Sequence, residues 1–392
     1  MILAHKIQLI PNNKQRTYFA RAAGTARFAY NWALEEWNKQ YSEGKAVTEG
    51  KLRKQLNAIK REKYPWMLAV TKCAPQLAIM NLGRAFKNYF DHNAERPRFH
   101  KKGRHDSFGI SNDHFKIIGD KISIPNLGKV RMAEELRFEG KVLGAVVSRK
   151  ADRWFVSVQV EIEDPKPIHT SISENQAVGV DLGLLDLAVL SDGTKITGSK
   201  PHKALLKRLR RMNKSLSRKT GARKGEKKSK NFIKTHNKLA RLHARIANIR
   251  NDETHKLTSM LTRNYSIIGI EDLNVSGMAR NHHLARAVLD MSFFEFRRQI
   301  EYKSGMTGSK VVVADRFYPS SKICSSCGHK REEELPLSIR EWDCSLCRTH
   351  HFRDQNAALN LKNNAVSCTV SACGELVEVV TSMKQEFNIK AG

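Results

Sequence analysis

The stretch Ala177-Val178-Gly179-Val180-Asp181-Leu182-Gly183 combines a run of apolar and small residues with an acid where that run ends. Such a run predicts a strand that is buried on both faces of a sheet. Two similar segments follow at residues 266–270 and 311–313, and helical patterns separate them. This alternation predicts an α/β architecture that begins near Gln176. Two further strands are expected at residues 186–190 and 195–197, around the Asp192-Gly193 turn.

Three acids follow these predicted strands or open a helix. Asp181 ends the first strand, Glu271 ends the strand at 266–270, and Asp354 opens a helix predicted over residues 353–362. Sites form at the carboxyl edge of such a sheet, and three acids that converge there repel one another unless they share cations. Mg²⁺ prefers hard oxygen ligands, and two such ions can assist the hydrolysis of a phosphodiester. The trio therefore fits nucleic-acid hydrolysis.

Spacing alone leaves an ordinary explanation for each of these acids. Asp and Glu commonly cap helices or end strands, and Gly183 supports only a close turn after Asp181. Other acids compete for the same role or are plausible solvated and capping groups: Asp186, Asp192, Asp272 and Asp343.

Two Cys-x-x-Cys pairs, Cys324 with Cys327 and Cys344 with Cys347, have the spacing of a four-cysteine zinc ribbon. Four sulfur ligands fill a tetrahedral Zn²⁺, so the predicted ion is structural and has no position for substrate. Three histidines near the quartet are possible substitute ligands, and three further cysteines lack paired partners of this kind. The histidines are expected at the surface or at phosphates, and the cysteines are expected to be ordinary thiols: His329, His350, His351, Cys73, Cys368 and Cys373.

The N-terminal part has a different pattern. Residues 2–9 predict a strand, and residues 14–90 have helical periodicity with recurring aromatic residues that are expected in a core. Short alternating segments then predict a small antiparallel β module, with a hairpin formed by residues 142–148 and 154–162. If the first strand joins that module, the helical block is an insertion within it. Pro165-Lys166-Pro167 predicts a linker.

The charge points to a polyanionic partner. The chain of 392 residues has a formal net charge of +30, and residues 200–250 contain 19 Lys and Arg against one acid, Glu226. Leucines at helical spacing predict two amphipathic helices there, joined by a basic turn with Gly221 and Gly225. A solvated face or an anionic membrane would be alternatives, but clustered charge of one sign favours contact with nucleic-acid phosphates.

The sequence also indicates the cellular compartment of the protein. No apolar run approaches the roughly 20 residues of a membrane span, and the N-terminus lacks the apolar core of a signal peptide. These features predict an intracellular protein. Seven cysteines in a reducing compartment favour metal binding or free thiols over disulfides.

Several motifs, in this order along the chain, carry a resemblance to a known family. They are Arg96-Pro-Arg-Phe99, Val-Gly-Val-Asp181-Leu-Gly, Gly-Ile-Glu271-Asp-Leu-Asn-Val, residues 286–303, Phe317-Tyr-Pro-Ser-Ser-Lys322, Cys324-Ser-Ser-Cys327-Gly, Glu341-Trp-Asp-Cys344 and Arg353-Asp354-Gln-Asn-Ala-Ala. Through nearly its whole length the chain resembles TnpB, the transposon-encoded RNA-guided nucleases.

The resemblance implies a multidomain α+β and α/β protein with a RuvC-like nuclease domain of RNase H fold, in which Asp181, Glu271 and Asp354 ligate two Mg²⁺. It further implies a zinc-bearing insertion and a β-barrel wedge domain that a helical recognition lobe interrupts. The expected bounds are 1–10 and 96–165 for the wedge, 11–95 for the lobe, 176–319 and 351–376 for the nuclease, 320–350 for the zinc insertion, and 377–392 for a tail.

The resemblance also implies partners. A guide RNA from the transposon end would pair with target DNA, beside a short flanking motif that the protein reads as duplex. The expected protein is a monomer on one guide RNA, cytoplasmic and nucleoid-associated in a bacterium or archaeon. A repressor that binds without cutting and a transposase that joins strands are the alternatives. The intact carboxylate trio argues against the first, and the lack of a convincing strand-transfer constellation argues against the second.

Two positions depart from the family pattern. The family has an acid where this chain has Phe352, just before Arg353 and Asp354, and a glycine where this chain has Arg348. Both departures concern the loop geometry beside the predicted third metal ligand.

Overall fold

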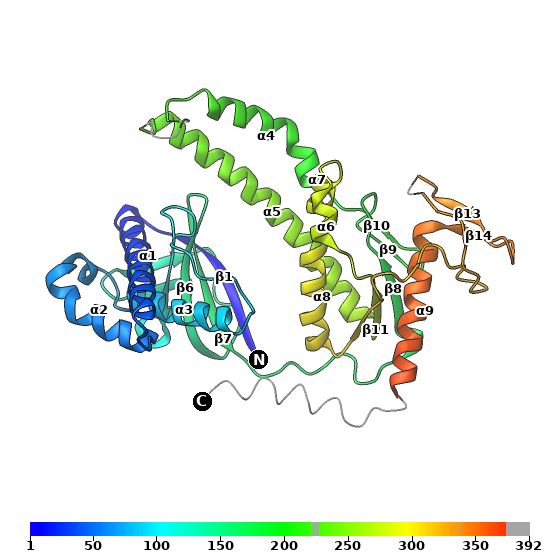
Figure 1. Ribbon diagram of the computed structural model, residues 1–392, viewed down its shortest axis with the longest axis horizontal. Coiled ribbons are helices and arrows are strands. Elements are labelled where there is room, and N and C mark those ends of the chain that lie inside the picture. The colour runs from blue at the N-terminus through cyan, green and yellow to red at the C-terminus, as the bar shows by residue number, and fades with distance from the viewer. Residues whose placement is uncertain (222, 224–226, 337, 374–392) are drawn as a thin grey trace. The chain divides into compact units, whose positions relative to one another are not determined.

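The computed structural model describes residues 1–221, 223, 227–336 and 338–373, in two compact units, Met1–Asp164 and Pro165–Gly392 (Figure 1). The division falls at the predicted proline-containing linker. Gly225, Glu226, residues 374–376 of the predicted nuclease domain and the predicted tail lie outside the described residues.

The first unit contains a seven-stranded antiparallel sheet in the order β2-β6-β7-β1-β5-β4-β3. Its strands are β1 (Ile2–Ile10), β2 (Ser107–Ser111), β3 (Lys116–Ile118), β4 (Lys121–Ile124), β5 (Gly128–Met132), β6 (Lys141–Lys150) and β7 (Arg153–Glu161). Because β1 pairs with both β7 and β5, the helices that follow it are inserted between strands of one sheet. Closure of this sheet into a barrel stays a prediction.

Three helices form the insertion: α1 (Asn13–Ser42), α2 (Glu49–Lys63) and α3 (Cys73–Phe90), with short 3₁₀ turns at Pro65–Ala69 and Asn112–His114. Asn12 begins α1 with a capping box, in which its side chain and that of Gln15 exchange hydrogen bonds with the backbone. Phe19 of α1 packs on Trp154 of β7 with ring centroids 5.3 Å apart, so helices and sheet share one core. Tyr41, one of the aromatic residues expected in the core, is instead 58% exposed.

The second unit is built on a five-stranded sheet in the order β10-β9-β8-β11-β12. Its strands are β8 (Ala177–Asp181), β9 (Ala188–Leu190), β10 (Lys195–Ile196), β11 (Ile267–Ile270) and β12 (Lys310–Val313). The strands β8, β11 and β12 are parallel, whereas β9 and β10 run antiparallel to their neighbours. The strands predicted at 177–181, 266–270 and 311–313 are therefore the three parallel strands, of which β12 is only half-buried.

Helices cover both faces of this sheet, and alternate residues of β8 and β11 explain how. Val178, Val180, Ile268 and Ile270 belong to a core with Leu257 and Leu261 of α5 (Lys230–Asn264) and Phe296 and Ile300 of α8 (Phe293–Thr307). Ala177 and Ile267 pack instead with Ala365 of α9 (Arg353–Cys373). Figure 1 shows the sheet between these helices.

The remaining elements of this unit are α4 (Pro201–Ser217), α6 (Val275–Arg280), α7 (Ala285–Met291), a 3₁₀ turn at Glu174–Gln176, and the zinc-region strands β13 (Glu341–Asp343) and β14 (His350–Phe352). The single helix predicted near 284–303 is wrong. It is α7 and α8, because Ser292 between them has a left-handed φ of 58°. The predicted helix over residues 353–362 continues to Cys373. No described helix is long and apolar enough to cross a membrane.

Candidate active site and zinc cluster

Two glycines let α9 lie unusually close to the sheet. Gly179 of β8 and Gly269 of β11 are paired directly across the two strands. A Cβ atom on Gly179 would lie 1.8 Å from the carbonyl oxygen of Ala358, and one on Gly269 would lie 2.3 Å from that of Leu361. Only a residue without a side chain fits at either position.

This close approach explains why the three acids meet. Side chains two residues apart on a strand lie on the same face, so Asp181 and Glu271 follow Gly179 and Gly269 on the face that carries α9. Asp354 lies in the first turn of α9, where the helix dipole favours a negative charge. The structure thus places Glu271 and Asp354 near enough for their charges to act on Asp181, although the oxygen atoms of the three acids do not all lie within 4.8 Å of one another.

The electrostatics of Asp181 reflect this convergence. Burial raises the pKa of its carboxyl group well above the usual value, and the charges of Glu271 and Asp354 raise it further. Arg353 and Arg340 act in the opposite direction but do not cancel the effect. A buried acid whose ionisation is further opposed by two neighbouring acids is a group that a shared cation would stabilise.

Neighbouring residues that the sequence did not reveal hold the other two acids. The Ser320 hydroxyl donates a hydrogen bond of 2.5 Å to Glu271 Oε1. Arg340 Nη1 lies 3.3 Å from Asp354 Oδ1. Both partners are distant in sequence from the acids they contact, and no spacing signal could have identified them.

The competing acids have other partners. Asp272 accepts hydrogen bonds from Arg297 and Arg316, and Asp186 accepts one from Thr197. Asp192 accepts from the Thr194 backbone and Tyr265, and Asp343 pairs with His350. These four acids therefore serve local ion pairs and turns.

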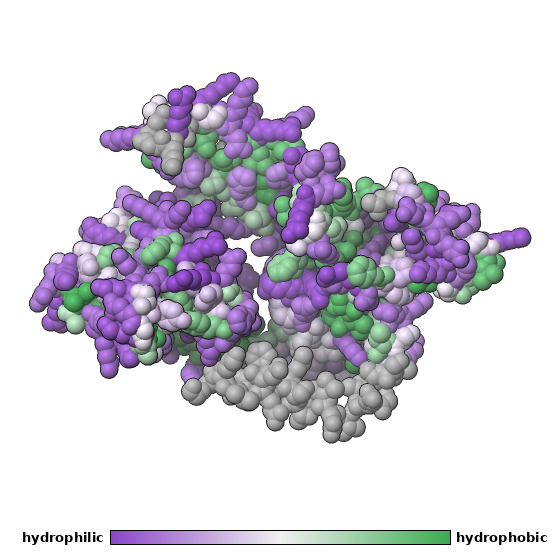
Figure 2. All heavy atoms as spheres, in the orientation of Figure 1, coloured by the Kyte–Doolittle hydropathy of each residue, from purple (hydrophilic) through white to green (hydrophobic). Residues whose placement is uncertain are grey.

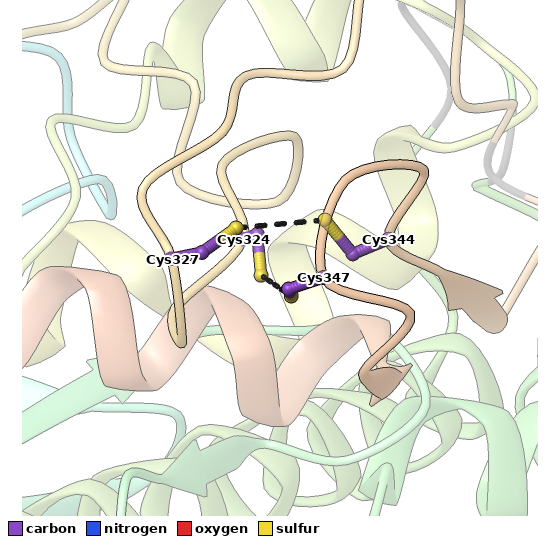
Figure 3. A group of neighbouring side chains, drawn as sticks. All are labelled: Cys324, Cys327, Cys344 and Cys347. Carbon is purple, nitrogen blue, oxygen red and sulfur yellow. Dashed lines mark hydrogen bonds between the residues drawn. The ribbon is translucent and has the colours of Figure 1, made fainter.

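The four predicted zinc ligands form a compact group (Figure 3). Their donor atoms all lie within 4.8 Å of one another. Among the described residues, no other group of three or more potential ligands is this compact. The sulfur atoms of Cys324 and Cys347 are 3.5 Å apart, and those of Cys327 and Cys344 are 3.6 Å apart. Zn–S bonds of about 2.3 Å in a tetrahedron require sulfur separations close to these. The donor set fits a closed Zn²⁺ site.

The two cysteine pairs sit in equivalent loops. The backbone N–H of Gly328 donates to the Cys324 carbonyl, and that of Arg348 donates to the Cys344 carbonyl, each at 2.9 Å. Gly328 and Arg348 both have left-handed backbones, with φ of 74° and 59°. The left-handed backbone at position 348 explains why the family has glycine there, and Arg348 adopts the same conformation with strain.

Hydrogen bonds around the sulfurs differ from one cysteine to another. Thr349 contacts the Cys347 sulfur at 3.2 Å and lowers the pKa of that thiol to about 6. The His329 backbone lowers the pKa of Cys327, but burial and the other three thiols raise it more, to about 12. His351 does not replace a cysteine in the group. Its Nε2 lies 3.0 Å from Cys324 Sγ as an outer partner.

Two asparagines tie the first cysteine loop to α9. Asn356 Nδ2 donates to the Ile323 carbonyl, and its Oδ1 accepts from the Ser325 N–H. Asn360, one turn later, donates to the Ser320 and Ile323 carbonyls at 2.7 Å each. The same helix therefore carries Asp354, anchors the cysteine loop and fixes the backbone of Ser320, the partner of Glu271.

Comparison with known proteins places this chain. Family models described as "Helix-turn-helix domain", "Probable transposase" and "Cas12f1-like, TNB domain" match residues 1–46, 157–282 and 293–361. The "Putative RNA-guided DNA endonuclease InsQ" of Escherichia coli K12 is 34% identical over 98% of this chain and 96% of its own length. The chain belongs to the TnpB family. A Streptomyces pristinaespiralis relative with the same description, apart from the name InsQ, is 35% identical over 95% of this chain and 91% of its own length.

A solved structure shares the fold of this TnpB-family chain. It is a cryo-EM structure of a Cas12f1-sgRNA-target DNA complex, with a TM-score of 0.58, 14% identity, and coverage of 90% of this chain and 84% of that one. The model described as a helix-turn-helix domain matches a region that here contains strand β1 and the single long helix α1.

The TnpB-family chain also presents a basic helical hairpin. The predicted helices at 200–250 are α4 and the first half of α5, packed through Leu209, Leu239, Leu242 and Ile246. Exposed basic residues recur every three or four positions: Lys203, Lys207, Arg210 and Lys214 on α4, and Lys230, Lys234, Lys238, Arg241 and Arg245 on α5. Figure 2 shows hydrophilic side chains projecting from this hairpin.

Buried Asp290 of α7 anchors the base of the hairpin. Its two carboxylate oxygens accept the backbone N–H groups of His202 and Lys203 in the first turn of α4, at 3.1 Å each. Arg250 of α5 binds the same carboxylate, with Nη2 2.6 Å from Oδ1. One acid therefore fixes where α4 begins and how α5 lies beside it.

Proposed function

We propose that this protein is an RNA-guided DNA endonuclease whose active site is the carboxylate trio Asp181, Glu271 and Asp354. The single observation that carries the proposal is their convergence from β8, β11 and α9, where burial, and then the charges of Glu271 and Asp354, raise the pKa of Asp181. Relatives described as RNA-guided DNA endonucleases, similar over nearly the whole chain, support the same reading.

The proposed cofactor at this site is a pair of Mg²⁺ ions. Carboxylate oxygens at the carboxyl edge of a sheet are the hard ligands that Mg²⁺ prefers, and Asp181, Glu271 and Asp354 would hold the ions. Bound Mg²⁺ supplies activation of water and stabilisation of the leaving oxygen in phosphodiester hydrolysis. Ser320 would orient Glu271, and Arg340 would stay beside Asp354 as a phosphate-binding cation.

The proposed role of the cysteine group is a structural Zn²⁺ site. Cys324, Cys327, Cys344 and Cys347 would fill the coordination shell, so the ion would stabilise the loop without taking part in hydrolysis. Asn356 and Asn360 would transmit that order to α9 and to the loop of Ser320.

The proposed domain assignment follows the family. The sheet of the second unit would be an RNase H-like, RuvC-type nuclease domain at 176–319 and 351–376, interrupted by the zinc insertion at 320–350. The sheet of the first unit would be a β-barrel wedge at 1–10 and 96–165, with the helical recognition lobe at 11–95. A single copy would bind one guide RNA and one double-stranded target DNA.

The test is a cleavage assay. The protein, purified with the transcript that flanks its own gene, is incubated with Mg²⁺ and a DNA library that carries the guide-matched target beside randomised flanks. We expect cut molecules that share one short flanking motif. Bound RNA and target without any cutting would contradict the proposal and favour a repressor that binds but does not cleave.

A further inference from the structure

A cavity of about 380 Å³ opens beside Glu271, at the carboxyl edge of the sheet. Its walls come from the ends of β8 and β11, the start of α6 and the first turn of α8. Leu182, Ile270, Leu273 and Phe293 give it an apolar floor, while Glu271 and Asn274 supply polar groups. Because Glu271 is a proposed metal ligand, a nucleotide bound in this cavity would lie near the proposed site of cleavage.

Exposed aromatic rings mark this cavity as a binding surface. Phe294, which lines it, is 70% exposed, although the next ring in the same turn, Phe296, is buried. Phe317 follows the lining residue Arg316 and is 87% exposed. Phe294 therefore offers an exposed aromatic face at the cavity, and Phe317 is a second exposed ring next in sequence to a lining residue.

The rim of the cavity is held in place by an acid with no role in the carboxylate trio. Asp272 binds Arg316 through two hydrogen bonds, of 3.0 and 2.6 Å, and also binds Arg297. Arg297 is held from its other side by Glu301 at 2.9 Å. The two guanidinium groups therefore keep fixed positions on the rim, where they can face a phosphodiester backbone.

We propose that this cavity receives one unstacked base of a single-stranded nucleic acid, the nucleotide next to the phosphate at Glu271, with Phe294 as its stacking surface. The inference rests on the proposed function. A flat apolar ring beside fixed guanidinium groups matches how single strands are bound, through base stacking and backbone contacts. A base within a duplex has both faces covered and its edge paired, so the cavity selects a strand that has been displaced or opened.

Phe294 is on this account a positioning residue, which holds the strand so that the phosphate stays at the carboxylates. Phe294→Ala should slow single-turnover cleavage by about 10-fold, the typical effect of losing one stacked base. Phe294→Trp should restore most of the rate because it keeps an aromatic face. Tyr302→Ala is the matched control, since Tyr302 is an aromatic residue two turns later on α8, 40% exposed and outside the cavity lining.

The decisive readout is fluorescence of 2-aminopurine placed, one position at a time, around the cleavage site of each DNA strand. The complete protein–guide RNA complex is used with Ca²⁺ in place of Mg²⁺, so the strand stays uncut. At one position we expect the displaced base to be quenched by stacking in the wild type and in Phe294→Trp, and to brighten several-fold in Phe294→Ala.

The outcomes separate this inference from the proposed function. If the wild type cuts its target but no position responds to Phe294→Ala, or if Tyr302→Ala has the same effect, the base-binding cavity is wrong and the nuclease assignment stands. If the wild type binds guide and target but never cuts, the proposed function fails first. Slowed cleavage by Phe294→Ala that Phe294→Trp does not restore would also contradict stacking.

Discussion

Arg348 has a left-handed backbone that costs folding free energy, and its departure from the family glycine is visible in the sequence. It follows the second cysteine pair with a φ of 59°, where its counterpart after the first pair is Gly328. An L-residue pays roughly 1–2 kcal/mol for this conformation, part of which glycine loses again in the unfolded chain. We expect Arg348→Gly to stabilise the metal-loaded second unit by about 0.5–1 kcal/mol, measured by thermal unfolding.

The mirror substitution is the control for Arg348. A Cβ on Gly328 would meet nothing within 4 Å, so Gly328→Ala tests backbone conformation without a steric clash. It should destabilise the second unit by about 1 kcal/mol. Stabilisation by Gly328→Ala, or a loss of stability in Arg348→Gly, would show that the left-handed backbone is not what limits this loop.

Asp181 gives a pH dependence with a definite sign. Its pKa in the folded protein lies above the ordinary 3.8, so the folded state holds the proton more tightly than the unfolded chain does. The resulting stability is present below about pH 4 and is lost as pH rises through the raised pKa. Without Mg²⁺ and with zinc retained, Asp181→Asn should therefore melt at least about 2 °C higher than the wild type at pH 8.

That difference should shrink as the pH is lowered from 8 through the raised pKa of Asp181, because the wild-type carboxyl group then takes up its proton. Added Mg²⁺ should raise the melting temperature of the wild type at pH 8 and leave that of Asp181→Asn nearly unchanged. A wild type that is more stable than Asp181→Asn at pH 8 without Mg²⁺ would contradict the repulsion among the three acids.

At the scale of elements, α9 links the zinc loop to the carboxylates. Asn360 donates to the carbonyls of Ser320 and Ile323, and its removal leaves buried acceptors without one of their donors, at a cost of about 1–3 kcal/mol. Asn360→Ala should loosen the first cysteine loop, seen as faster amide exchange there, and slow cleavage through Ser320. Asn363→Ala, at an exposed position of the same helix, should change neither.

The sequence predicted the elements well wherever their pattern was local. The buried strands, the cysteine pairs and the acids at strand ends can each be recognised from a few neighbouring residues. The break at Ser292 did not, because serine carries no signal for a left-handed backbone and the apolar spacing continues across it. The contacts of Ser320 and Arg340 depend on how α9 and the cysteine loops fold back on the sheet, which no local pattern encodes.

In the sequence, Gly179 and Gly269 look like ordinary members of buried strands. The structure explains why glycine is needed at both positions, because the backbone of α9 occupies the space that a side chain would fill. A glycine inside an apolar strand is a signal of close approach, but the sequence alone does not say what approaches.

At the scale of the whole molecule, the excess of positive charge is the main physical signature. The stripe on α5 formed by Lys230, Lys234 and Lys238 predicts contact with a phosphate backbone. Replacing all three with Gln should reduce the slope of log K against log salt for nucleic-acid binding by about 2–3. Replacing them with Arg should leave the slope unchanged, because the charge is kept. An unchanged slope in the Gln variant would remove this stripe from the interface.

The proposed nuclease activity depends most directly on the three carboxylates. Its sharpest test is the single-turnover rate of target cleavage by the protein–guide RNA complex in Mg²⁺, compared between the wild type and Asp181→Ala. Asp186→Ala serves as the control, because Asp186 lies in the loop after the same strand and contacts Thr197 instead. We predict a loss of more than about 100-fold for Asp181→Ala, with bound target retained, and a near wild-type rate for Asp186→Ala. Cleavage by Asp181→Ala at the wild-type rate would contradict the account.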